Sequence, residues 1–245
     1  MTVQLLKLAR TLGVAVEQLD YLGDVSDADL RAFRLQITDL FVAGQEPGLR
    51  RVAQASKVIP AQITAKMVAR SRGALLAARM SGVLDPSHAV DVAKRLPVDF
   101  LADIAARLDP RHAAAINGGL SEATIVAIGK ELAAREDWLT LGDLVASISD
   151  TVARAAESAL DGVALVRSAY LVDDTTQLAR FVNLASPDKL TEMLYATAEN
   201  DLWSQYRCVL DALSESAIDV VRTAAEQLPV EQRARALAEI VERRG

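Results

Sequence analysis

The sequence predicts an all-α fold, a superhelical solenoid of short stacked helices. Leucines recur every 12 residues from Leu84 to Leu132, and the phrase Leu-Asp-Pro-x-His-Ala begins at Leu84 and again at Leu108. Each unit carries apolar residues at the i, i+3, i+4, i+7 spacing of an amphipathic helix. Alternation typical of strands is absent over any useful length. Together these patterns indicate an internal repeat of helices.

Each repeat unit begins with a helix-start pattern. In Asp85-Pro86, and again in Asp109-Pro110, the Asp side chain can accept hydrogen bonds from the first turn, and proline at the first helical position gives up no needed donor. A 12-residue unit therefore holds a helix of about two to three turns and a tight corner. Such a helix is too short to stand alone in water and must pack on its neighbours. Two helices make one predicted repeat of 24 residues.

The 12-residue period slips once and then continues. Ile148, Leu160, Val172 and Leu184 are again 12 apart, but the gap from Leu132 to Ile148 is 16. The larger gap predicts about one extra helical turn near residues 133–138.

The chain divides into three predicted parts. Residues 1–46 form an N-terminal helical hairpin, with a second helix that is capped by Ser26 and ends near Gly44. Residues 47–84 form a basic amphipathic segment after the Gly- and Pro-containing loop at 44–48. Residues 85–245 form the repeat array, and its last helix has a polar end, Glu239 to Arg244, that suits a terminal cap.

The middle part has a distinct charge. The net charge is −3 before residue 47, +7 across 47–84 and −10 afterwards, so the overall −6 hides a dipolar arrangement. Lys66 with Arg70, and Arg72 with Arg79, are spaced to share helix faces. The cations of this segment are the candidate residues for binding an anionic surface: Arg50, Arg51, Lys57, Lys66, Arg70, Arg72 and Arg79.

Two interpretations of this basic segment remain open. It binds anionic lipid or an acidic partner, or it docks on the acidic remainder of the chain or simply faces solvent. Nucleic acid is not expected, because the chain is acidic overall and no nucleic-acid-binding motif accompanies the segment.

The sequence predicts no catalytic, cofactor or metal site. His88 and His112 occupy equivalent repeat positions near helix N-termini, and two imidazoles fall short of the four ligands of structural zinc. Cys208 is expected to be a buried structural cysteine, and Trp138 and Trp203 are expected to be core residues. No phosphate loop, dinucleotide fingerprint, nucleophile elbow or HExxH motif occurs. We therefore expect a protein that is not an enzyme.

The repeated pattern Leu-Asp-Pro-x-x-Ala-x-x-apolar-Ala-x-x-Leu-Pro resembles the cytoplasmic N-terminal domain of MgtE-type magnesium transporters, and the short-helix repeats of the flagellar motor-switch protein FliG are related. The match is best from Leu84 to Leu132 and weaker to about Leu194. The resemblance implies a superhelical interaction module. It does not imply magnesium transport, because no transmembrane helices and no candidate ion-sensing pair of domains follow, and no metal site is carried over.

These observations predict a cytoplasmic, non-enzymatic helical-repeat module that binds a protein partner or itself. One alternative is a peripheral membrane protein that binds anionic lipid through residues 47–84. Another is a carrier of an apolar small molecule in a cavity between helices. The single cysteine excludes an internal disulfide framework. The N-terminal residues lack the pattern of a signal peptide, and no apolar run is long enough to cross a bilayer.

Overall fold

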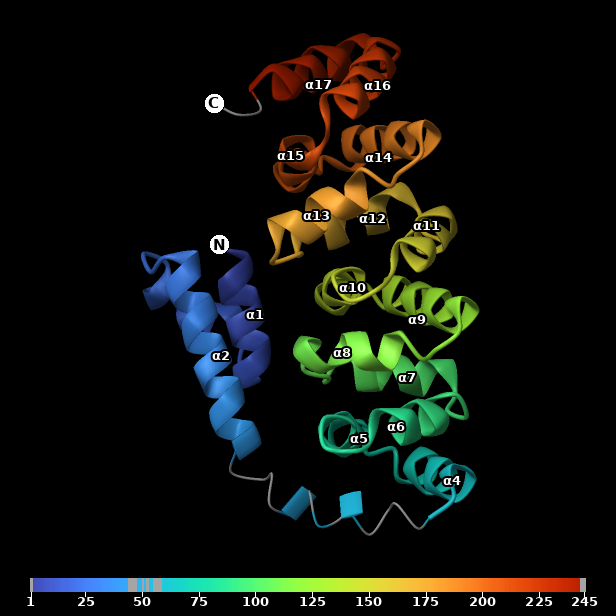
Figure 1. Cartoon of the computed structure of the whole chain (residues 1–245). Coiled ribbons are helices and arrows are strands. Elements are labelled where there is room, and N and C mark those ends of the chain that lie inside the picture. Colours follow the sequence, from blue (N-terminus) through green and yellow to red (C-terminus); the bar gives the residue numbers. More distant parts are fainter. Residues whose placement is uncertain (1, 44–47, 50, 52, 55–58, 243–245) are drawn as a thin grey trace.

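The structure is a computed structural model that describes residues 2–43, 48, 49, 51, 53, 54 and 59–242. Within these residues every regular element is a helix, which confirms the all-α prediction. A hairpin built by the first 43 residues lies along one side of a tall stack of short helices (Figure 1). Most of the predicted loop at 44–48, and the candidate residues Arg50 and Lys57, lie outside the described residues.

The hairpin contains α1 (Val3–Leu12), the 3-10 helix η1 (Val16–Leu22) and α2 (Asp27–Ala43). Ser26 caps α2 as predicted, because its hydroxyl accepts a hydrogen bond from the Asp29 N–H at 3.1 Å. The helices of the stack are mostly two to four turns long and are joined by tight corners: α4 (Ala61–Ser71), α5 (Ala74–Ser81), α6 (Pro86–Ala93), α7 (Val98–Ala105), α8 (Pro110–Asn117), α9 (Glu122–Ala134), α10 (Trp138–Val145), α11 (Asp150–Ala159), α12 (Gly162–Tyr170), α13 (Thr175–Val182), α14 (Pro187–Asn200), α15 (Trp203–Ala212), α16 (Glu215–Glu226) and α17 (Val230–Glu242).

The 12-residue register predicted from the sequence sets the helix starts. Helices α6, α7, α8 and α9 begin at Pro86, Val98, Pro110 and Glu122. The Asp85 carboxylate accepts from two N–H groups of the first turn of α6, and Asp109 accepts from the N–H of Arg111 in α8. These bonds satisfy donors that have no partner inside the helix. The Asp-Pro pattern therefore marks the helix starts that it predicts.

The predicted slip in the period is also present. Helix α9 runs for 13 residues to Ala134, whereas its neighbours α8 and α10 have eight. The extra turn therefore lengthens α9 at its C-terminal end, and α10 begins 16 residues after α9 begins.

Most helices of the stack pack against the second helix after them. The pairs are α4 with α6, α5 with α7, α6 with α8, α7 with α9, α8 with α10, α9 with α11, α10 with α12, α12 with α14, α13 with α15, α14 with α16 and α15 with α17. One hydrophobic core runs through the stack from Ala65 to Ile240. Apolar burial along this core is what stabilises helices that are individually too short.

Close packing in the stack requires glycine at a corner. Gly119 follows α8, and a Cβ atom built there would lie 2.5 Å from Cγ2 of Val90 in α6. That distance is far below van der Waals contact, so a side chain at this corner would push the α6 and α8 layers apart.

The basic segment differs from the prediction at one point. Helix α4 ends at Ser71, and Arg72 follows it with a left-handed backbone, φ 48°. Arg79 lies on the next helix, α5. The prediction that Arg72 and Arg79 share a helix face is therefore wrong, because a corner at Gly73 separates them. Lys66 and Arg70 do lie on one helix, α4, and both are exposed.

The hairpin has a hydrophobic core of its own. Its buried members come from all three elements and are separate from the core of the stack: Leu5, Leu8, Ala9, Leu19 and Leu30, with Val16, Leu22 and Ile37 packed around them. The hairpin is thus held together by apolar burial among its own elements. What holds it against the stack is a different kind of contact.

Candidate interaction surfaces

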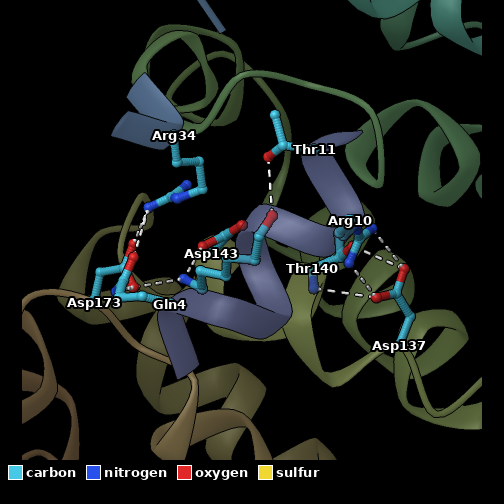
Figure 2. Close-up of polar contacts among 9 residues, drawn as sticks. Gln4, Arg10, Thr11, Arg34, Asp137, Thr140, Asp143 and Asp173 are labelled. Atoms are coloured by element: carbon cyan, nitrogen blue, oxygen red, sulfur yellow. Dashed lines mark hydrogen bonds and ion pairs between the residues drawn. The ribbon is translucent and has the colours of Figure 1, made fainter. Parts of the chain in front are cut away.

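Helix α1 has two faces with different partners. Leu5, Leu8 and Ala9 point into the core of the hairpin. A polar stripe of Gln4, Lys7 and Arg10, spaced three residues apart, faces the stack (Figure 2). Three residues correspond to slightly less than one helical turn, so these side chains lie along one side of α1.

The partners of the polar stripe form an acidic face of the stack. We define the acidic face as Asp137, Asp143 and Asp173, which come from the start of α10, from within α10, and from the corner between α12 and α13. Gln4 donates to Asp173, Lys7 to Asp143, and Arg10 to Asp137. From the N-terminal to the C-terminal end of α1, the aspartate partners come from earlier and earlier positions in the sequence. One helix therefore contacts more than one layer of the stack.

Lys7 is the most buried charge of this contact. Its side chain is 4% exposed, and Nζ lies 2.8 Å from Asp143 and 3.0 Å from Asp173. A buried ammonium without a partner is strongly disfavoured, so these two carboxylates are what allow a lysine at this position.

Arg10 makes a network at the other end of α1. Its guanidinium contacts both carboxylate oxygens of Asp137 at 2.8 and 3.1 Å. It also donates to the Thr140 hydroxyl and to the Ala106 carbonyl at 2.9 Å. Asp137 in turn caps α10 by accepting from the Thr140 N–H. The docked hairpin therefore engages a residue that also caps a helix of the stack.

Helix α2 adds two ion pairs. Arg34 donates to Asp173 at 2.7 Å, so Asp173 receives contacts from Arg34, Lys7 and Gln4 (Figure 2). Farther along α2, Asp39 pairs with Arg111 of α8 at 2.8 Å. The Asp39 pair is largely exposed and contributes little by comparison.

The docked cations change the acidity of the acidic face. Burial alone would raise the pKa of Asp173, but the charges of Lys7 and Arg34, with hydrogen bonds from Lys7 and Gln4, bring the pKa below its ordinary value. Two effects also oppose each other at Asp137. Burial raises its pKa, but the hydrogen bonds and charge of Arg10 outweigh burial and lower the pKa overall. Both carboxylates are held in the ionised form that pairs with the hairpin.

A second surface lies at the end of the stack formed by α4 and α5. We define the basic end as the cations Lys66, Arg70, Arg72 and Arg79 with the apolar side chains Ile63, Met67, Leu75 and Leu76. The four apolar side chains are 48–61% exposed. Of the candidate residues, Arg51 is also exposed, Arg79 is half-buried, and Arg72 pairs with Asp99 at 3.6 Å. Exposed apolar groups among cations form an amphipathic surface.

The remaining candidates are two histidines, one cysteine and two tryptophans. His88 and His112 sit at equivalent positions of α6 and α8, and no group of three metal-ligating side chains occurs among the described residues. Cys208 is half-buried, its Sγ donates to the Gln205 carbonyl, and burial raises the pKa of its thiol to about 12. Trp203 is a core residue, whereas Trp138 is only partly buried.

The structure has shallow surface hollows. One of about 380 Å³ lies between α14 and α16 and is lined in part by Thr191, Asp219 and Gln227. Another of about 280 Å³ lies where the hairpin meets the stack, between Val3, Arg31 and Asp173. Both are open to solvent, unlike the enclosed apolar cavities that bury most of a small ligand.

Sequence reasoning missed the acidic face and the polar stripe. The available indication was weak: Lys7 and Arg10 are the charged residues of α1, and they precede an acidic array. The sequence does not indicate which of the 26 acidic residues after position 84 would pair with Lys7 and Arg10. The stripe looks like an ordinary solvent-facing side of an amphipathic helix.

None of the protein families, curated proteins or solved structures compared with this chain matches it. In the described part of the chain, no helix combines the length and the apolar character needed to cross a membrane.

Proposed function

We propose that this chain is a non-enzymatic, cytoplasmic helical-repeat module that binds a protein partner or itself through its acidic face. The observation that carries the proposal is the docking of α1, whose polar stripe contacts three aspartates of the stack, two from α10 and one from the corner between α12 and α13. The likeness to the MgtE-type N-terminal domain and to FliG belongs to the same proposal and concerns architecture alone.

The chemistry of the contact supports recognition rather than permanent cohesion. The described contacts between α1 and the stack are ion pairs and hydrogen bonds, while the hydrophobic cores of hairpin and stack are separate. Apolar burial gives most of the cohesion inside domains, and charge complementarity mainly gives specificity and fast association. A face that holds a helix mainly by charge is suited to exchanging that helix for another with the same spacing of cations.

A peptide titration tests this function. The probe is a fluorescent peptide of residues 2–14, held helical by a hydrocarbon staple at positions 5 and 9, away from the polar stripe. The receptor is the full chain with Lys7→Glu and Arg34→Glu, which repel its own hairpin from the acidic face. We expect binding by fluorescence anisotropy that weakens steeply as salt rises.

The matched control is the same receptor with Asp143→Lys and Asp173→Lys added. This control should lose binding, because the peptide then meets charges of its own sign. Equal binding to both receptors, or to neither, would show that the acidic face is not a binding site for helices.

The basic end supports a second candidate function, a peripheral association with anionic lipid. Exposed Ile63 and Met67 can enter the acyl boundary while Lys66 and Arg70 on the same helix pair with headgroups. Flotation with vesicles containing phosphatidylserine, at low and at physiological salt, tests it. Binding that is lost in Lys66→Glu with Arg70→Glu supports the candidate, and absence of binding at low salt rejects it.

A further inference from the structure

We propose that the N-terminal hairpin exchanges between two copies of this chain, so that α1 of each copy docks on the acidic face of the other in a closed dimer. The proposal rests on the proposed function and names its partner as a second copy of the chain. Three observations lead to it.

The first observation is that the hairpin is a separable unit. It has a hydrophobic core of its own, and the chain joins it to the stack through residues 44–60. At 3.3–3.6 Å per residue, a connection of 17 residues has an upper limit of about 55–60 Å, roughly twice the length of a 20-residue helix. That reach lets a hairpin arrive at the acidic face of a neighbouring copy.

The second observation is that the contact is made by side chains of the hairpin and of the stack alone, so the same pairs can form between two copies. Lys7, Arg10 and Arg34 find the same aspartates whether the stack belongs to their own chain or to another. Since these contacts are the same in monomer and dimer, the length of the linker and any new contacts between the copies determine which form is more stable.

The third observation is the placement of exposed apolar side chains. Of the thirteen large apolar residues exposed in the described part of the chain, eleven lie between Leu12 and Leu76. Leu40 and Phe41 end α2 just before the linker, and Ile63 and Met67 lie on α4 just after it. Because these four side chains flank the connection between hairpin and stack, we expect an exchange of hairpins to bring those of the two copies near one another.

A second copy explains this placement better than a lipid surface does. Anionic lipid fits the cations of α4, but α2 carries Asp27, Asp29 and Asp39 against two arginines, one of which is already paired with Asp173. Lipid therefore accounts for the exposed apolar residues of α4 and leaves those of α2 unexplained. A second copy accounts for both groups.

Complementary charge reversals test the exchange. One full-length variant carries Lys7→Glu and Arg34→Glu in the hairpin, and the other carries Asp143→Lys and Asp173→Lys in the stack. In each variant the hairpin and the face of the same chain have charges of the same sign, so they repel each other. In the mixture, the negative hairpin of the first variant fits the reversed face of the second, and the positive hairpin of the second fits the acidic face of the first. We expect light scattering to give the monomer mass of 26.3 kDa for each variant alone and twice that mass for the mixture.

The matched control replaces the stack variant with one that carries Asp188→Lys and Asp219→Lys, two exposed acids of α14 and α16. At a concentration where the wild type is monomeric, its mixture with the hairpin variant should stay monomeric. A dimer in this control mixture would show that net charge alone causes association, and would overturn the proposal. A monomeric test mixture would overturn it as well. If the stapled peptide still binds the acidic face in that case, the exchange is wrong and the proposed function stands.

A shortened linker gives a second test without any charge reversal. Deleting residues 50–57 leaves nine linker residues and shortens the reach by about half. A shorter connection should favour docking on another chain over return to the same chain, so we expect this variant to dimerise at lower concentrations than the wild type. A variant that stays monomeric up to the same concentration as the wild type would contradict the proposal.

Discussion

Replacing Lys7 with methionine should release the hairpin while leaving the stack folded. Breaking a buried ion pair by removing one partner costs about 3–5 kcal/mol when the remaining charge stays buried. Here Asp143 is 33% and Asp173 16% exposed, and Asp173 retains Arg34, so part of the charge left behind is hydrated or paired. We therefore expect about 2 kcal/mol, and because 1.4 kcal/mol corresponds to tenfold, the docking equilibrium should weaken about 30-fold.

Hydrogen exchange measured by mass spectrometry checks this value. Amides of α1 should exchange about 30-fold faster in Lys7→Met, while amides of α12 and α14, inside the core of the stack, should change little. The matched control is Lys66→Met on exposed α4, which should leave α1 unchanged. Equal loss of protection in α1 and in the stack would refute the reasoning, because it would mean that hairpin and stack unfold as one unit.

Three further predictions concern pH, packing and a buried hydroxyl. Because Asp173 has a pKa below its ordinary 3.8 when docked, docking should be constant above about pH 5 and weaken as pH falls through the lowered value, as seen in NMR shifts of α1. Gly119→Ala should destabilise the fold by about 1–3 kcal/mol in urea unfolding, partly relieved by Val90→Ala, while Gly48→Ala, whose methyl group meets nothing within 4 Å, should not. Tyr206→Phe should leave the melting temperature unchanged or raise it, because the buried phenol hydroxyl has no hydrogen-bond partner among the described residues; a clear drop would reveal a partner.

The helix starts were predictable because their causes are local. Asp85 and Asp109 cap the helices that follow them, and a proline after each one fits the first helical position. The extra turn of α9 also appears in the sequence as the 16-residue gap from Leu132 to Ile148. Local hydrogen bonding and apolar spacing are enough for these features, since both act within about one turn of the chain.

Long-range polar contacts could not be predicted in the same way. The pairing of Lys7 with Asp173 joins residues 166 positions apart, and its strength depends on a burial that only the folded chain creates. Arg72 shows the limit at short range, since its spacing from Arg79 fits a helix that in fact ends at Ser71. The left-handed position after α4 is held by Arg72 and not by the glycine usual there, so only Gly73 marks the break in the sequence.

The charge pattern of the chain takes on a specific meaning in the folded structure. One interpretation of the basic segment is that it docks on the acidic remainder, but the acidic face is occupied by cations of the hairpin, Lys7 and Arg10. Lys66 and Arg70 stay exposed beside apolar side chains. The hairpin thus neutralises the acidic face and leaves the basic end charged. Moving the hairpin to another chain changes what the acidic face binds, and in the proposed dimer it also covers Ile63 and Met67 of the basic end, so the two surfaces are coupled.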